Sequence, residues 1–219
     1  MSRPFLLDAA VARHIAGNKL RLRKRFPFVT MLEPLEACNL SCQGCGRVRE
    51  YRDVMDRRLS VDECLAAVRA SGAPIVSISG GEPLLHREIG EIVRALSEDG
   101  RYMYLCTNGL LLRDRLDGFE PSRQLAFGVH LDGTEAGHDR VTERPGTYET
   151  AIAAIREAVA RGHRVCTNTT LFHGSDVEDL HRLFGTLQGL GVEGLMVSPG
   201  YAYGDVSDRD LFLERQESV

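Results

Sequence analysis

Residues 28–46 read FVTMLEPLEACNLSCQGCG and contain the features on which the predicted fold depends. The apolar run 28–32 has the length and the β-branched and aromatic content of a buried strand. A polar loop follows and places Cys38, Cys42 and Cys45 within eight residues. A strand that leads into such a loop is typical of α/β proteins, whose sites lie at the carboxyl ends of parallel strands.

The composition of the 219-residue chain excludes several classes of protein. Lys and Arg number 27 against 31 Asp and Glu, so the net charge is −4 and there is no basic excess for sequence-independent nucleic-acid binding. No run approaches the roughly 18 apolar residues of a membrane span, and the N-terminus has no secretory signal pattern. The sequence therefore predicts a cytoplasmic protein, in which six cysteines need an explanation other than disulfides.

From residue 28 onward, short apolar runs alternate with longer helical patterns. Strands are predicted at 28–32, 74–79, 102–107, 125–131, 164–172 and 195–198. Helices are predicted at 60–71, 89–98, 148–161 and 177–190, with a short helical stretch after residue 107. Ser60 and Glu63 have the spacing of a capping box at the start of the first of these helices.

Six strand–helix alternations specify parallel β/α units. A closed eight-unit barrel needs about 250 residues, so the sequence predicts an open, partial (β/α)6 barrel with outer helices. This barrel domain is expected at 28–219. Its sixth helix is cut short at Val219, which indicates a fragment or an unusual tail.

An N-terminal helical segment is expected at 1–27, with a helix over 5–25 that Pro27 ends. Its last turn would hold a basic run, which complements the helix dipole: Arg21, Arg23, Lys24 and Arg25. A second hypothesis is that this run touches acidic lipid headgroups at the inner face of the membrane.

Each predicted strand ends in polar or glycine residues, which places a site on one rim of the barrel. In chain order these ends are 38–45, Gly80-Gly81-Glu82-Pro83, Cys106-Thr107-Asn108, His130-Leu131-Asp132-Gly133, 167–170 and 198–201. His138 and Asp139 are expected to open a polar loop before the helix at 148–161 and to cap it locally.

The spacing Cys38-x3-Cys42-x2-Cys45 provides three thiolates on one loop. Structural zinc prefers four ligands, and His86 or His130 could complete such a set. Three thiolates also suit a [4Fe–4S] cluster whose fourth iron has no protein ligand. Both alternatives remain open from spacing alone.

The cysteine loop after the first strand, followed by Gly-Gly-Glu-Pro after the second, resembles the radical S-adenosylmethionine superfamily. Within it, a set of motifs is similar to the adenosyl-hopene transferases of hopanoid lipid biosynthesis, over about residues 5–213. The motifs are Met31-Leu-Glu-Pro-Leu, Ala37-Cys-Asn-Leu-Ser-Cys-Gln-Gly-Cys-Gly, Ser71-Gly-Ala-Pro, Ser77-Ile-Ser-Gly-Gly-Glu-Pro-Leu, Tyr104-Leu-Cys-Thr-Asn, Val129-His-Leu-Asp-Gly and Ser198-Pro-Gly-Tyr-Ala-Tyr.

The resemblance implies roles for the residues of the rim. Cys38, Cys42 and Cys45 would ligate a [4Fe–4S] cluster whose open iron binds S-adenosylmethionine. Gly80 and Gly81 would let the backbone approach the methionyl group, whose ammonium Glu82 would bind. Further contacts with S-adenosylmethionine are expected from Asp132, Asn168 and Arg144, although a strand-end hydrogen bond or a surface charge would also explain these three.

The resemblance also implies a reaction, in which a 5′-deoxyadenosyl radical adds to the terminal alkene of the lipid diploptene. The resulting tertiary radical gains a hydrogen atom, for which the Cys106 thiol is the expected donor. The alternative for Cys106 is a buried cysteine that packs as a small hydrophobe, as expected for Cys64 and Cys166. A flavodoxin- or ferredoxin-type protein would supply electrons.

The sequence departs from that family in three places. Gly44 replaces the aromatic residue that the superfamily usually has before its third cysteine, residues 46–58 differ, and the family's cysteine-bearing C-terminal region is absent. Two other functions therefore remain. One is a radical enzyme that abstracts hydrogen from another small molecule or peptide, and the other is a non-catalytic metal-binding protein.

Overall fold

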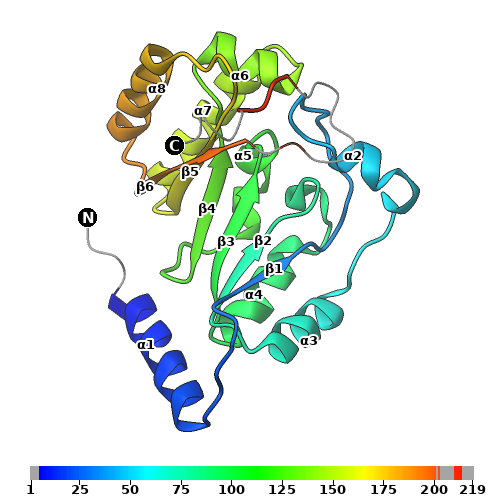
Figure 1. Cartoon of the computed structure of the whole chain (residues 1–219), viewed down its shortest axis with the longest axis vertical. Coiled ribbons are helices and arrows are strands. Elements are labelled where there is room, and N and C mark those ends of the chain that lie inside the picture. The colour runs from blue at the N-terminus through cyan, green and yellow to red at the C-terminus, as the bar shows by residue number, and fades with distance from the viewer. Residues whose placement is uncertain (1–4, 201, 203–209, 214–219) are drawn as a thin grey trace.

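Six parallel strands form one sheet in the order of the chain, and the sheet curls into a half-barrel (Figure 1). The strands are β1 (Val29–Leu32), β2 (Ile75–Ile78), β3 (Tyr102–Thr107), β4 (Leu125–His130), β5 (Arg164–Leu171) and β6 (Gly194–Pro199). The computed structural model describes residues 5–200, 202 and 210–213, so Tyr201 and Tyr203 of the last sequence motif lie outside the described residues. The predicted partial (β/α)6 barrel is confirmed.

Helices connect the strands, and the larger of them cover the convex face of the sheet (Figure 1). The helices are α2 (Arg47–Glu50), α3 (Val61–Ser71), α4 (Ile89–Glu98), α5 (Leu112–Arg115), α6 (Glu135–Thr142), α7 (Thr147–Ala160) and α8 (Val177–Gly189), with short 3₁₀ turns at Arg52–Val54, Pro83–Leu85 and Leu116–Gly118. The predicted capping box is present at α3: Ser60 Oγ accepts from the Glu63 N–H, and the Glu63 carboxylate accepts from the Ser60 N–H.

Alternate side chains of the strands face these helices and form the main hydrophobic core. Val76 and Ile78 of β2, Leu105 of β3 and Phe127 of β4 are fully buried there. Because side chains alternate along a strand, the residues between them lie on the concave face. The concave face therefore carries smaller and more polar residues, among them Ser77, Cys106 and Gly128 in neighbouring strands.

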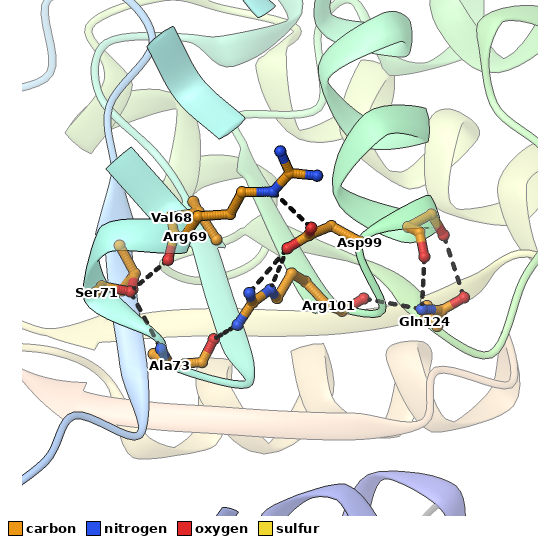
Figure 2. Close-up of polar contacts among 9 residues, drawn as sticks. Val68, Arg69, Ser71, Ala73, Asp99, Arg101 and Gln124 are labelled. Carbon is orange, nitrogen blue, oxygen red and sulfur yellow. Dashed lines mark hydrogen bonds and ion pairs between the residues drawn. The ribbon is translucent and has the colours of Figure 1, made fainter. Parts of the chain in front are cut away.

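A polar network closes the amino end of the sheet, away from the rim where the site is expected (Figure 2). The Asp99 carboxylate accepts from Arg69 of α3 at 2.7 Å and from Arg101 at 2.8 Å. Arg101 also donates to the carbonyl of Ala73 at 2.7 Å, and the Gln124 amide donates to the carbonyls of Ser97 and Arg101. These contacts join the starts of β2, β3 and β4, so their role is in stability.

The first helix, α1 (Phe5–Leu20), stands apart from the half-barrel at the end of the molecule opposite α6 (Figure 1). It ends five residues earlier than predicted, because Leu22 adopts a left-handed φ of 57° and the Arg23 N–H returns to the carbonyl of Asn18. The basic residues that follow thus lie in an exposed connection and not in the last helical turn, which corrects the sequence prediction.

The prediction of a polar loop before the helix at 148–161 is partly wrong as well. The segment forms α6, and His138 is buried within it. Asp139 does cap the next helix, since its carboxylate accepts from the N–H groups of Gly146 and Tyr148. A short helix of polar residues has no apolar periodicity by which it could be recognised in the sequence.

Candidate active site

The three-cysteine loop begins at the carboxyl end of β1 and brings its thiols close enough to interact. Burial, followed by the neighbouring thiols of Cys45 and Cys38, raises the pKa of Cys42 to about 12. Burial likewise raises the pKa of Cys38. Thiolates gathered in this partly buried place need the positive charge of a metal to form together.

The donor set of this loop suits an iron–sulfur cluster. Among the described residues, no three His, Cys, Asp or Glu side chains converge tightly enough to hold one metal ion. The two histidines that could have completed a zinc site have other partners. His86 contacts the carbonyl of Leu59 and the N–H of Glu88, and His130 contacts Asp132. The donor set that remains is three thiolates, which suits a [4Fe–4S] cluster with one open iron.

The Gly-Gly-Glu loop after β2 packs directly on the backbone that precedes the cysteines. The N–H groups of Gly81 and Glu82 donate to the carbonyls of Leu35 and Ala37 at 3.1 and 2.8 Å. A Cβ at Gly80 would collide with the Leu35 carbonyl, and one at Gly81 with the carbonyls of Glu36 and Ala37. Both glycines are thus needed for backbone–backbone contact, a reason different from the approach to a ligand expected from sequence.

Glu82 is buried and joins the ends of β2 and β3. Its carboxylate accepts from the N–H of Leu84 at 3.0 Å, the hydroxyl of Thr107 at 2.8 Å and the N–H of Asn108 at 2.8 Å. Burial raises the pKa of this carboxyl, although the three hydrogen bonds oppose the shift. The Asn108 amide in turn donates to Asn39, the residue after Cys38, at 2.7 Å. The loop is therefore tied to β3 as well.

Arg47, which the sequence analysis did not single out, connects the two ends of the cysteine loop. It lies two residues after Cys45 and forms ion pairs with Glu33 and, at 3.4 Å, with Glu36, both of which precede Cys38. Its guanidinium also lies 4.9 Å from the ring centroid of Tyr51. Opposite charges flanking a cysteine motif were the only signal for this contact in the sequence.

Cys106 lies on the concave face near the carboxyl end of β3. Its Sγ is 3.6 Å from Ser77 Oγ on β2, and on its other side lies Gly128 of β4, which has no side chain to cover the sulfur. Burial raises the pKa of this thiol, so it holds its proton at neutral pH. By contrast Cys64 is fully buried in the main core, as expected, whereas Cys166 is buried on the concave face, beside Gly128 of β4.

Asp132, after β4, is the centre of a hydrogen-bonded group. One carboxylate oxygen is 2.6 Å from His130 Nε2, and the other accepts from the Thr170 N–H at 2.7 Å. Burial lowers the pKa of His130, but the Asp132 carboxylate outweighs it and the net shift is upward. Asn168 on β5 lies 3.5 Å from the other nitrogen of this histidine. Asp132 and Asn168 thus both contact His130 at the rim, and their contacts to a ligand remain predictions.

Arg144 lies on the exposed turn between α6 and α7, three residues after Val141, whose carbonyl accepts from the Gln43 N–H of the cysteine loop. In the part of the chain that the structure describes, its guanidinium forms no ion pair. Its predicted pairing with a carboxylate stays a prediction.

Comparison with known families identifies the superfamily of this chain. A profile described as the Radical SAM superfamily matches residues 32–187. No helix among the described residues is long and apolar enough to cross a membrane.

Curated relatives include GTP 3′,8-cyclase 1 of Mycobacterium tuberculosis, 31% identical over 191 residues, which cover 82% of this chain and 53% of that protein. The AdoMet-dependent heme synthase of Methanosarcina barkeri is 29% identical over 170 residues, covering 75% and 48%. The chain thus spans about half the length of these relatives.

Solved structures support the fold. SuiB of Streptococcus suis superposes with a TM-score of 0.73 at 16% identity, over 90% of this chain and 46% of that one. SuiB bound to S-adenosylmethionine gives 0.69 at 17% identity, covering 90% and 44%. The carboxyl rim described above is the part of this fold that carries the cysteine loop.

Proposed function

This chain belongs to the radical SAM superfamily, and we propose that it transfers the 5′-deoxyadenosyl group of S-adenosylmethionine to the alkene of a hopene. Members of the superfamily bind a [4Fe–4S] cluster and S-adenosylmethionine, and these are the cofactors of this protein. Cys38, Cys42 and Cys45 would hold the cluster. When bound, the two cofactors supply a 5′-deoxyadenosyl radical.

The observation that carries the proposal is the position of the Cys106 thiol. A reaction that adds a radical to an alkene leaves a carbon radical, which needs a hydrogen atom to give the saturated product, and a protonated thiol can supply it. Cys106 offers a protonated thiol on the concave face, between the small residues Ser77 and Gly128. Gly128 places no side chain against the sulfur on that side.

The proposed step balances in atoms and electrons. A C–C bond forms between the 5′ carbon and the terminal alkene carbon of diploptene, which leaves a tertiary radical on the hopane side chain. Cys106 Sγ gives up its hydrogen atom to that carbon and becomes a thiyl radical. One electron from a flavodoxin- or ferredoxin-type donor and one proton then restore the thiol.

The test is an anaerobic assay with reconstituted protein, S-adenosylmethionine, a strong reductant and diploptene, analysed by mass spectrometry. The expected product has the mass of adenosylhopane and disappears in Cys38→Ala. If the wild-type protein instead cleaves S-adenosylmethionine and releases only 5′-deoxyadenosine, the transfer is wrong for this substrate.

A second candidate is hydrogen abstraction from another small molecule, with 5′-deoxyadenosine as by-product. The specific support is that the curated relatives named above are a GTP cyclase and a heme synthase. Deuterium transfer from a candidate substrate into 5′-deoxyadenosine would identify it. A non-catalytic metal-binding protein would bind zinc in place of iron and would not cleave S-adenosylmethionine.

We also propose that the connection after α1 holds the protein at the inner face of an anionic membrane, where a lipid alkene is available. Leu20 and Leu22 are 85% and 87% exposed. They alternate with the exposed basic residues Lys19, Arg21, Arg23, Lys24 and Arg25, in a chain whose net charge is −4. Basic residues near an anionic surface contribute about 1 kcal/mol each, and leucines can enter the headgroup boundary.

Flotation with vesicles tests this contact. Wild-type protein should float with anionic vesicles and not with neutral ones. Replacing the four residues Arg21, Arg23, Lys24 and Arg25 by Gln should abolish flotation. A control with the same loss of charge at exposed positions elsewhere, Arg87, Arg94, Arg113 and Arg156, should still float. Equal flotation of both variants would exclude this segment as the contact.

A further inference from the structure

The ring of Phe172 occupies the space next to the backbone of the cysteine loop. Phe172 directly follows β5, and its side chain is 8% exposed. A Cβ placed on Gly44 would lie 2.7 Å from both Cε1 and Cζ of this ring, which is closer than atoms can pack. Gly44 lies between Cys42 and Cys45 in the sequence. The ring therefore contacts the loop between two of the three cysteines.

A second glycine receives the other part of the ring. A Cβ on Gly200, the residue after β6, would lie 3.0 Å from Phe172 Cε1 and 3.1 Å from Cδ1. The ring therefore lies between two stretches of backbone that are far apart in the sequence. Neither Gly44 nor Gly200 has a positive φ, so the need for glycine at these positions comes from the ring and not from the backbone conformation.

Phe172 is itself held firmly. Its N–H donates to Ser175 Oγ at 3.0 Å, and its carbonyl accepts from the Ser175 N–H at 3.1 Å. Phe212 packs against it with ring centroids 5.9 Å apart at 71°. Together with Val141 and Leu211 these residues form a small hydrophobic cluster separate from the main core.

The same small cluster touches the cysteine loop by a hydrogen bond as well. The Gln43 N–H donates to the carbonyl of Val141 at 2.9 Å, and the His173 N–H donates to the carbonyl of Leu211 at 2.8 Å. The half of the loop that holds Cys42 and Cys45 thus rests on Phe172 and Val141. The half that holds Cys38 rests on the Gly-Gly-Glu loop and on Asn108.

We propose that Phe172 is a positioning residue for the cluster: its ring, seated against Gly44, fixes the spacing of Cys42 and Cys45 and so the geometry of the bound cluster. The inference rests on the cluster of the proposed function and on no step of the alkene chemistry. It also accounts for glycine before the third cysteine, since the aromatic ring at this place comes from Phe172, after β5, and not from position 44.

A double-mutant cycle tests the direct contact between the ring and the loop. In Gly44→Ala the new methyl group collides with the ring, and we expect the reconstituted cluster to lose iron to a chelator about tenfold faster, the scale found when supporting partners of metal ligands are disturbed. Phe172→Leu removes the two ring atoms that the methyl group meets. In that background Gly44→Ala should have little further effect, because the two changes are coupled.

The electron paramagnetic resonance spectrum of the reduced cluster, with and without S-adenosylmethionine, provides the second readout. It should change in Gly44→Ala and return toward the Phe172→Leu spectrum in the double variant. Phe119→Ala is the matched control, because Phe119 is 7% exposed and packs on Phe127 in the main core. It should lower the thermal stability without altering the spectrum or the rate of iron loss.

Iron loss and spectra in Gly44→Ala that match the wild type would overturn the inference, as would additive effects in the double variant. A wild-type protein that binds a stable cluster but yields no adenosylhopane would refute the proposed transfer and leave the inference intact. A wild-type protein that takes up no cluster would refute both.

Discussion

The N–H of Glu82 donates a 2.8 Å hydrogen bond to the carbonyl oxygen of Ala37, the residue immediately before the first cysteine of the loop. Through this bond the second β/α unit holds the start of the loop that the first unit provides. The contact is possible only because Gly81, next to Glu82, has no side chain. The geometry of the cysteine loop is therefore set largely by residues outside it.

Replacing Gly81 by alanine should separate these two loops. The added Cβ would collide with the carbonyls of Glu36 and Ala37, which are backbone atoms and cannot rotate away. We expect a loss of about 2–3 kcal/mol in the free energy of unfolding, as for overpacked sites, together with poor cluster retention. Urea denaturation and iron analysis would measure both effects.

The matched control is Gly185→Ala in α8, where a Cβ meets nothing within 4 Å. That variant should gain about 0.5–1 kcal/mol from the better helix propensity of alanine. A Gly81→Ala protein as stable as this control would contradict the packing argument.

Glu82→Gln should weaken the junction of β2 and β3. The carboxylate accepts three hydrogen bonds, and an amide keeps only one of the two oxygens, so its NH2 group would face a backbone N–H, of Asn108 or of Leu84, that is itself a donor. A buried unpaired donor costs about 1–3 kcal/mol. Thermal unfolding would measure the loss, with Glu91→Gln on the exposed face of α4 as the control expected to be neutral.

Cys106→Ser should stop the completed transfer while S-adenosylmethionine is still cleaved. An O–H bond is much stronger than S–H, so serine keeps the shape of the side chain but cannot give up a hydrogen atom. Mass spectrometry should show adenosylhopane formed more than about tenfold more slowly, a barrier increase of at least about 1.4 kcal/mol.

Cys166→Ser is the comparison for this variant, since Cys166 lies on the same face of the sheet two strands away. It should retain the product. Unchanged adenosylhopane formation in Cys106→Ser would remove the thiol from the proposed reaction.

His138 predicts a dependence of stability on pH. Burial lowers the pKa of this histidine from 6.5 to about 4, so the folded protein keeps it neutral while the unfolded chain binds a proton below pH 6.5. The stabilisation is present above pH 6.5 and is lost as the pH falls toward 4, because the unfolded state then binds more protons. The expected loss is about 3 kcal/mol.

His138→Asn isolates this contribution. The asparagine carbonyl can still accept from the Asp132 N–H, as His138 Nδ1 does, but it does not titrate. The difference in unfolding free energy between wild type and variant should therefore change between pH 7 and pH 4.5. A constant difference over that range would show that His138 is protonated in the folded protein.

The strands and large helices were predictable because their apolar periodicity is strong. The 4–8-residue runs at β2, β3 and β5 and the Ser60–Glu63 cap appear where the sequence predicts them. The end of α1 was not predictable, because it depends on a left-handed backbone conformation at Leu22, which leucine rarely adopts. Helix α6 was missed because eight mostly polar residues carry no periodic signal.

In the site, the cysteines and the Gly-Gly-Glu motif could be identified from residue type and spacing. The residues that hold the cysteine loop in place could not be identified in this way. Arg47 pairs with residues on the far side of the loop, and Phe172 meets Gly44 across 128 positions of sequence. Such contacts depend on how the units pack, and a single sequence records the two partners without recording that they meet.

The contact between the two loops has a consequence for how the protein matures. On the ribosome the cysteines emerge before Gly80 and Gly81, so the loop has no surface to rest on until β2 has joined β1. Cluster insertion should therefore follow the docking of the second β/α unit. Iron delivered earlier would meet the three cysteines in an unstructured segment. Iron uptake by nascent chains stalled before and after β2 and Gly81 have emerged would measure that order.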